Sequence, residues 1–311
     1  MYIIEALFPI VAIAFLAWFC AHRNFISETE TRALEKFAFN FLIPCMLFYG
    51  AVTAQLPDTM NWSLLWGYYL AVLAVYLLGM VIGRLRYGPG QARLSVVGMG
   101  CAYPNVTILG IPICLELLGQ EAFVPMFMII ALHNLLIFSF GTVVAELQRE
   151  AGRTIGAHVW KIAKELVRNP ISGSIVVGMV INLAGIPIWG PLLQALELLS
   201  RAGVPVALMT LGAGLNRYQV RGEVPMALLI TAIKLLLLPG LVWLLTGFVF
   251  EMDYLWVQTA VLLACMPVGI SVYVFSIRYH TMENLAATAI VLSCALSVLS
   301  ISFYAFLLGV R

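Results

Sequence analysis

Charged side chains are scarce in this chain of 311 residues. Only 10% of its residues are Asp, Glu, Lys or Arg, whereas soluble domains carry about 25%. Apolar residues make up 62% of the chain, and its mean hydropathy is +1.00. This composition excludes an ordinary soluble domain and is typical of an integral membrane protein. The chain also lacks a basic patch interleaved with aromatic residues, so we expect no nucleic-acid partner.

Motifs for catalysis and metal binding are missing as well. The sequence contains no H-E-x-x-H, no G-x-S-x-G and no Walker A loop, and it has only four histidines. None of its six cysteines forms a C-x-x-C pair, which indicates neither a metal site nor a disulfide framework. We therefore expect no cofactor, no metal and no enzymatic activity; an intramembrane enzyme is the less favoured alternative. The sequence also shows neither a repeated selectivity filter nor rings of charged residues, the features that usually indicate a channel.

Long uncharged runs are what the chain has instead. About 20 apolar residues cross a bilayer as a helix. Ten segments meet this requirement: residues 3–21, 36–55, 63–83, 94–115, 122–145, 169–188, 192–215, 224–249, 254–277 and 285–309. We predict an all-α polytopic membrane protein with ten transmembrane helices. In the seventh segment, Glu197 and Arg201 stand four residues apart, and this spacing predicts an ion pair on one helix face.

Basic residues alternate between successive loops. The loops after the first, third, fifth, seventh and ninth segments, with their borders, hold most of the 17 Lys and Arg residues, and the loops between them hold none. Cytoplasmic loops collect Lys and Arg. The sequence therefore predicts a multi-pass protein of the cell (inner) membrane with both termini on the extracytoplasmic side.

The largest basic loop divides the ten segments into two halves. We predict a first five-helix repeat at residues 1–146, a cytoplasmic amphipathic linker at 147–168 and a second repeat at 169–311. Because each half holds an odd number of helices, the second repeat would be inverted relative to the first. Inverted repeats are common in secondary transporters, whose substrate sites lie near the bilayer midplane at interrupted helices.

Prolines interrupt the fourth and ninth segments near their centres. The fourth contains YPNVTILGIP around Pro104, and the ninth contains CMPVGISVYVF around Pro267. Proline removes a backbone donor and clashes with the carbonyl four residues back, so both helices should break and cross at mid-membrane. The second half of each helix would aim its positive N-terminal end at the crossing. Asn105 adds an amide that can donate to a carboxylate. No function is assigned to Pro112.

Three further polar residues lie deep in predicted helices. His133 and Asn134 sit midway along the fifth segment, where they would contact substrate or bond a neighbouring helix; His133 could instead carry a coupling proton. Lys234 lies roughly 15 Å along the eighth segment from its cytoplasmic end. It would compensate the charge of an anionic substrate, reach the interface, or pair with a carboxylate such as Glu5 or Glu35.

The interrupted segments also resemble a known family. YPNVTILGIP and CMPVGISVYVFSIRYH are similar to the fourth- and ninth-helix motifs of the auxin efflux carrier family, which includes the plant PIN carriers and bacterial carriers of malonate and similar acids. Looser matches are LEKFAFNFLIPCMLF, ALMTLGAGL and KLLLLPG. The resemblance implies a ten-helix inverted-repeat fold whose helices 4 and 9 cross at Pro104 and Pro267, often in a homodimer. It also implies substrate contacts by Asn105 from one side and by Val268 and Gly269 from the other.

These observations predict a secondary active transporter of a small organic anion, such as a mono- or dicarboxylate or an auxin-like acid, that works by alternating access. The predicted substrate-binding residues are Pro104, Asn105, Val106, His133, Asn134, Pro267, Val268 and Gly269, and Lys234 and His133 are the candidates for charge compensation or coupling. The expected partners are the anion, a coupling proton or sodium ion, the lipid bilayer and a second copy of the chain. The alternative is a sodium-coupled organic-anion symporter of the bile-acid type, which shares the crossed helices.

Overall fold

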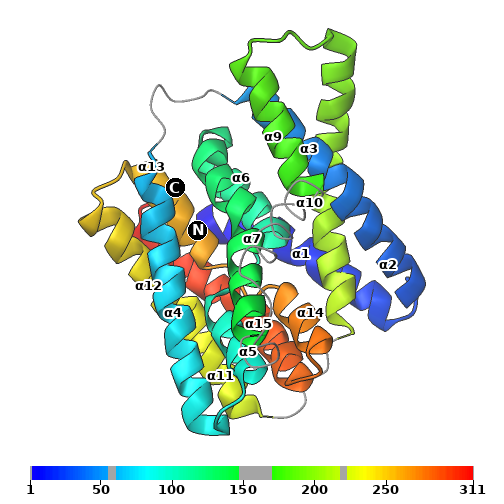
Figure 1. The fold of residues 1–311 in the computed structure, drawn as a ribbon. Coiled ribbons are helices and arrows are strands. Elements are labelled where there is room, and N and C mark those ends of the chain that lie inside the picture. The colour runs from blue at the N-terminus through cyan, green and yellow to red at the C-terminus, as the bar shows by residue number, and fades with distance from the viewer. Residues whose placement is uncertain (1, 55–60, 147–169, 218–222, 311) are drawn as a thin grey trace.

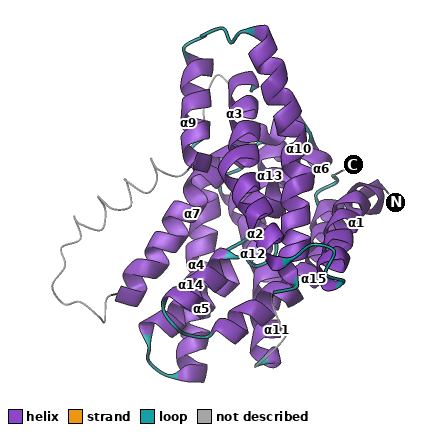
Figure 2. Cartoon of the chain, turned by 90° about the vertical axis from the view of Figure 1, so that its right-hand side faces the viewer, coloured by secondary structure: helices purple, strands orange, loops and turns teal. Residues whose placement is uncertain are grey.

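The protein is helical throughout the part that the structure describes. The computed structural model describes residues 2–54, 61–146, 170–217 and 223–310, and no strand occurs among them (Figure 2). The linker helix predicted at 147–168 lies outside these residues. The elements in chain order are α1 (Tyr2–His22), α2 (Glu28–Phe37), η1 (Ala38–Leu42), α3 (Ile43–Thr53), α4 (Ser63–Tyr87), α5 (Gln91–Ala102), η2 (Val106–Gly110), α6 (Ile111–Leu118), η3 (Gln120–Ala122), α7 (Phe123–Glu146), α9 (Pro170–Leu183), α10 (Gly190–Leu215), α11 (Val224–Ala232), η4 (Ile233–Leu237), α12 (Leu238–Trp243), η5 (Leu244–Val249), α13 (Tyr254–Ala264), α14 (Ser271–Arg278) and α15 (Glu283–Leu307).

Six continuous helical stretches are long and apolar enough to cross a membrane. They are Glu28–Thr53, Ser63–Tyr87, Gln120–Ala145, Gly190–Leu215, Val224–Val249 and Glu283–Leu307. Shorter apolar helices cover Phe8–His22, Ala92–Ala102, Val106–Leu118, Gly173–Leu183 and Tyr254–Ala264. Each segment predicted from the sequence overlaps one of these helical stretches within the described residues, and the fourth and ninth also contain non-helical residues.

Three prolines follow turns of π-helix. Pro44, Pro112 and Pro239 each take the second position of an α-helix, directly after the five-residue π-helical elements η1, η2 and η4. A π-turn carries one extra residue, which widens the helix where the proline ring would clash and where its missing N–H leaves a carbonyl unpaired. The carbonyl of Leu235, four residues before Pro239, accepts a hydrogen bond from Ser300 Oγ at 2.5 Å. Pro112 thus has a structural explanation as the start of α6.

The helices form two bundles. In the smaller bundle, α10 packs against α1 and α3, and α3 also packs against α9. In the larger bundle, made of α4 to α7 and α11 to α15, α5 packs between α4 and α7, and α11 packs on α15. Figure 1 shows α2, α3, α9 and α10 on one side of the molecule and α4 and α12 on the other. Each bundle therefore combines helices from before and after residues 147–169.

Glycines bring helices close together inside the smaller bundle. A Cβ atom placed on Gly212 of α10 would lie 1.9 Å from the carbonyl oxygen of Ala14 in α1. That distance is far below a van der Waals contact, so the two helices can pack this closely only because position 212 carries no side chain.

Gly212→Ala is expected to lower the free energy of unfolding by about 1–3 kcal/mol, because the added methyl group must push α1 and α10 apart. The melting temperature of the purified protein in detergent measures the loss. Gly190→Ala is the matched control, since nothing lies within 4 Å of a Cβ at that position. Equal melting temperatures of the two variants would contradict the contact.

Candidate functional site

Two helices are interrupted at the positions of Pro104 and Pro267. α5 ends at Ala102, and helical structure resumes at Val106; α13 ends at Ala264, and α14 begins at Ser271. In each gap a proline supplies no backbone N–H, which prevents the helix from continuing in its regular pattern. Four half-helices therefore point their ends at two short non-helical segments, residues 103–105 and 265–270.

The two non-helical segments pair with each other. Asn105 N donates to Pro267 O at 2.8 Å, and Gly269 N donates to Tyr103 O at 2.9 Å. Pro104 and Val268 form an antiparallel bridge between these two bonds. The N–H of Val268 itself donates to Ser293 Oγ of α15 at 3.0 Å. The backbone groups released by each break are thus largely satisfied by the other break and by one serine.

A glycine makes this pairing sterically feasible. A Cβ atom on Gly269 would lie 2.6 Å from the ring of Tyr103. Because residue 269 has no side chain, the Tyr103 ring can pack directly against the backbone of the break at residues 265–270. Gly269 therefore allows the two backbones to approach closely, and it is also one of the predicted site residues.

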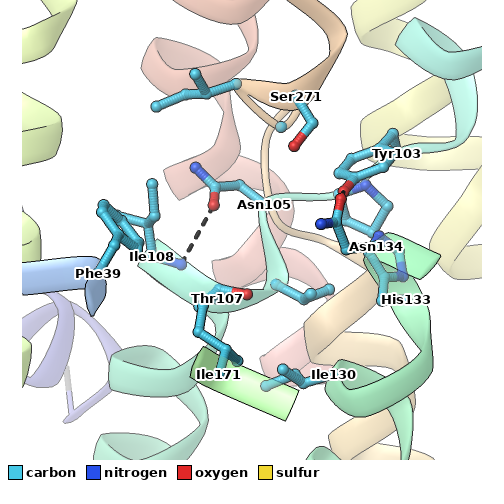
Figure 3. Close-up of a pocket in the computed structure, with 14 residues that line it drawn as sticks. Phe39, Tyr103, Asn105, Thr107, Ile108, Ile130, His133, Asn134, Ile171 and Ser271 are labelled. Carbon is cyan, nitrogen blue, oxygen red and sulfur yellow. Dashed lines mark hydrogen bonds between the residues drawn. The ribbon is translucent and has the colours of Figure 1, made fainter. Parts of the chain in front are cut away.

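A cavity of about 170 Å³ lies beside the paired segments (Figure 3). Most of its wall comes from the larger bundle, and Phe39 of η1 and Ile171 of α9 close it from the smaller bundle. The lining residues are Phe39, Tyr103, Pro104, Asn105, Val106, Thr107, Ile108, Ile130, His133, Asn134, Ile171, Gly269, Ile270 and Ser271. None of them is Asp, Glu, Lys or Arg, so the polar groups of the cavity wall are amides, hydroxyls, an imidazole and backbone.

Asn105 has one satisfied and one unsatisfied side-chain atom. Its Oδ1 accepts from Ile108 N at 3.2 Å and so caps the N-terminus of η2. Its Nδ2 has no hydrogen-bond partner within the described residues, although the residue is only 6% exposed. Figure 3 shows this nitrogen on the side of the amide that faces away from Ile108. A buried donor without a partner is costly, and an acceptor on a bound ligand would satisfy it.

His133, Asn134 and Tyr103 form the opposite wall. The Tyr103 hydroxyl donates to Asn134 Oδ1, and the Tyr103 and His133 rings meet edge to face with centroids 4.9 Å apart. His133 is 1% exposed and lies beside the Pro104 carbonyl, but neither ring nitrogen has hydrogen-bond geometry to a described residue. This wall adds an amide and an unpaired imidazole to the unpaired Asn105 donor.

The backbone makes the cavity favourable for negative charge. The first N–H groups of a helix lack partners within the helix, and its N-terminal end carries a partial positive charge. Both second half-helices, η2 with α6 and α14, begin at the cavity wall with Val106 and Ser271. Since no carboxylate is among the described lining residues, two helix ends and the Asn105 amide form an environment suited to an anion.

Most predicted site residues line the cavity. Those that do are Pro104, Asn105, Val106, His133, Asn134 and Gly269. Pro267 and Val268 take part in the crossing without lining the cavity. Lys234 does not reach it: the side chain is 0% exposed and donates to the Ala264 carbonyl at 2.7 Å.

Two alternatives for Lys234 are wrong. Complete burial excludes a side chain that reaches the membrane interface. Glu35 is not its partner, because that carboxylate pairs with Arg217 at 3.0 Å. The side chain of Glu5 lies outside those that the structure describes. By contrast, the predicted pair of Glu197 and Arg201 is confirmed, with Arg201 NH2 2.6 Å from Glu197 Oε1.

Several lining residues were not predicted from the sequence. Thr107 and Ser271 lie in the first turns of the two second half-helices, inside the quoted motifs, and a search for hydroxyls there would have found them. Phe39 and Ile171 belong to helices of the smaller bundle, far away in the sequence. No local pattern marks them, because their contact with the crossing depends on how the bundles pack.

Comparison with known proteins assigns the family. The family described as "Membrane transport protein" matches residues 2–305. The chain belongs to this family. The match agrees with the motif resemblance to the auxin efflux carriers, and with the apolar helices it identifies a multi-pass membrane transport protein. Family membership indicates transport in place of catalysis.

Two named relatives are similar to this chain over most of its length. A protein of Rhizobium meliloti (strain 1021) named "Putative malonate transporter" is 25% identical over 235 residues, which cover 75% of this chain and 72% of the relative. An "Uncharacterized transporter" of Methanothermobacter thermautotrophicus is 23% identical over 310 residues, which cover 98% of each chain.

Ser293→Ala is expected to lower the free energy of unfolding by about 1–3 kcal/mol, because it leaves the buried N–H of Val268 without an acceptor. Ser297→Ala is the matched control: among the described residues Ser297 bonds to Cys294 O in its own helix, just as Ser293 also bonds to Ile290 O, and it makes no bond to the crossing. Melting temperatures in detergent compare the two variants. If both variants lose the same stability, Ser293 does not support the crossing.

Proposed function

We propose that this chain is a secondary active transporter that carries a small organic anion by alternating access. The observation that supports this function most is the buried amide nitrogen of Asn105, which has no partner among the described residues and lies beside two half-helix N-termini. Such a wall suits a carboxylate, which accepts hydrogen bonds but cannot donate them. His133 and Asn134 would contact the same ligand from the opposite wall.

A short carboxylate is the substrate class that fits best. The cavity of about 170 Å³ is small beside ligand pockets of roughly 300–1,000 Å³, which favours a mono- or dicarboxylate over a larger, auxin-like indole acid. The name of the Rhizobium relative makes malonate the first compound to test.

The proposed topology has ten transmembrane helices in two inverted repeats. The first two helical stretches of each half join the smaller bundle and the last three join the larger one, which supports a repeat. Ion pairs also bring predicted cytoplasmic loops to one end: Arg217 after α10 pairs with Glu35 of α2, and Arg86 of α4 lies 3.4 Å from Glu223 before α11. Both termini would then lie outside, and a homodimer belongs to the same proposal.

The two bundles provide the moving parts for alternating access. The cavity lies between them, with Ile171 in the first turn of α9 at the proposed cytoplasmic side. Phe123 precedes His133 by ten residues, or about 15 Å along α7. There it packs against α3 so closely that a Cβ on Gly50 would lie 2.0 Å from its ring. This contact would close the outer side in the present conformation.

A polar cavity begins where that contact ends. It has a volume of about 540 Å³ and is lined by Gly50 and Phe123 together with Gln120, Glu121, Glu197 and Arg201. Residues of both bundles again form its wall. In the proposed mechanism it is the outer vestibule, and separation of Gly50 from Phe123 connects it to the substrate site.

Asn105→Asp tests the binding site. The new carboxylate keeps an acceptor for Ile108 N but removes the donor and adds a negative charge, so malonate affinity should fall at least about 10-fold. Thermal shift with malonate and malonate counterflow in proteoliposomes measure the loss. Asn61→Asp is the matched control, because Asn61 Oδ1 caps Ser63 N in the same way outside the cavity. Unchanged malonate binding in Asn105→Asp would contradict the proposed binding site.

Gly50→Ala tests the proposed outer closure. The methyl group would displace Phe123 and favour the outward-open state. A cysteine introduced at Thr107, in the substrate cavity behind this contact, should then react faster with a membrane-impermeant maleimide added outside than it does in the parent with Gly50. Gly190→Ala in the same background controls for a general loosening of the helices. Equal labelling rates in all three proteins would show that the contact between Gly50 and Phe123 does not close the outer side of the cavity.

A further inference from the structure

Lys234 is a buried cation that the proposed substrate site does not use. It lies in η4, is 0% exposed, and forms no ion pair with any residue whose side chain the structure describes. Its Nζ donates to Ala264 O at 2.7 Å. A charged ammonium in an apolar interior is costly unless something nearby compensates it. The identity of its one partner therefore matters.

Ala264 is the last residue of α13, where the break releases carbonyl groups. The carbonyls of Val261, Leu262 and Leu263 accept from the N–H groups of Cys265 and Met266. In an uninterrupted helix Ala264 O would accept from Val268 N, but that N–H bonds to Ser293 instead. The carbonyl left over by the break is the one that Lys234 binds.

The end of a half-helix is itself a site for positive charge. Its carbonyls carry the equivalent of about −0.5 charge, and in interrupted membrane helices such ends commonly coordinate a transported or coupled cation. In this chain a side chain reaches the same place. The ammonium lies at hydrogen-bonding distance from the terminal carbonyl, inside protein, with no water needed to complete the contact.

The other polar neighbours bring no fixed negative charge. Among the described residues, the titratable groups close enough to interact electrostatically with Lys234 are the thiols of Cys101 and Cys265 and the imidazole of His133. The hydroxyl of Ser300 bonds to the neighbouring carbonyl of Leu235. The compensation for the ammonium therefore comes from the C-terminal end of α13.

We infer that Lys234 is a built-in counter-ion, whose ammonium fills a monovalent-cation site formed by the C-terminal end of α13 at the crossing. Removal of the side chain would leave that site open to a small free cation such as sodium, potassium or methylammonium. With Lys234 present, the crossing needs no sodium ion at this position. That consequence, but not the site itself, rests on the proposed transport function.

The test measures melting temperatures of the purified full-length protein without substrate. Buffers of equal ionic strength contain N-methylglucamine, sodium, potassium or methylammonium chloride. The wild-type protein should melt at one temperature in all four. Lys234→Ala should melt lower in N-methylglucamine by on the order of 5 °C. At least one small cation should restore half or more of this loss, with saturation.

Ser300→Ala is the matched control, because it removes a hydrogen bond to the adjacent carbonyl of Leu235 without removing a charge. Its melting temperature should not respond to the choice of cation. Three results would overturn the inference: wild-type stability that rises selectively with sodium, a Lys234→Ala protein as stable as wild type, or a loss that no small cation restores.

Lys234→Met covers the case in which Lys234→Ala does not fold. Methionine fills most of the space but offers neither charge nor donor, so this variant should melt below wild type and ignore all four cations. A Lys234→Met protein at least as stable as wild type would overturn the inference. The melting experiments contain no substrate, so they do not depend on malonate binding. If malonate failed to bind the wild-type protein, the proposed function would be contradicted, but the test of the cation site would still hold.

Discussion

The structure depends on one requirement: backbone polar groups in an apolar interior must find partners within the protein. Each proline break violates that requirement alone, and the two breaks together meet it. Asn105 N bonds to Pro267 O, and Gly269 N bonds to Tyr103 O. A third bond, from Val268 N to Ser293, joins the crossing to α15. Four helix ends are thereby held at one point, which no single interrupted helix could achieve.

The composition and the two prolines predicted much of this arrangement. The scarcity of charge predicted a membrane protein, and YPN and MPVG marked the positions where α5 and α13 stop. These predictions succeeded because proline acts locally, through its missing donor and its ring. The family match then confirmed transport as the general function. The count of ten crossings, their inversion and their orientation stay predictions.

Other features could not be predicted because they depend on contacts between distant segments. Nothing in KLLLLPG shows that Lys234 meets a carbonyl thirty residues later, and the search for a carboxylate partner led to Glu35, which binds Arg217. Phe39 and Ile171 lie at the cavity because two bundles face each other there. Side-chain type shows that a partner is needed, and only the packing of helices shows which partner is available.

The π-turns before Pro44 and Pro239 change the angular register of their helices. One extra residue in a turn rotates everything after it by about 100° relative to an unbroken α-helix. If the apolar residues repeated with one α-helical period along the whole helix, those that face the core before η1 or η4 would face another direction after it. Each of these helices thus consists of two segments in different phase. Deletion of a single residue in a π-turn would therefore restore a regular helix while its second half keeps its present neighbours, whereas the same deletion in a regular turn would rotate the second half away from them.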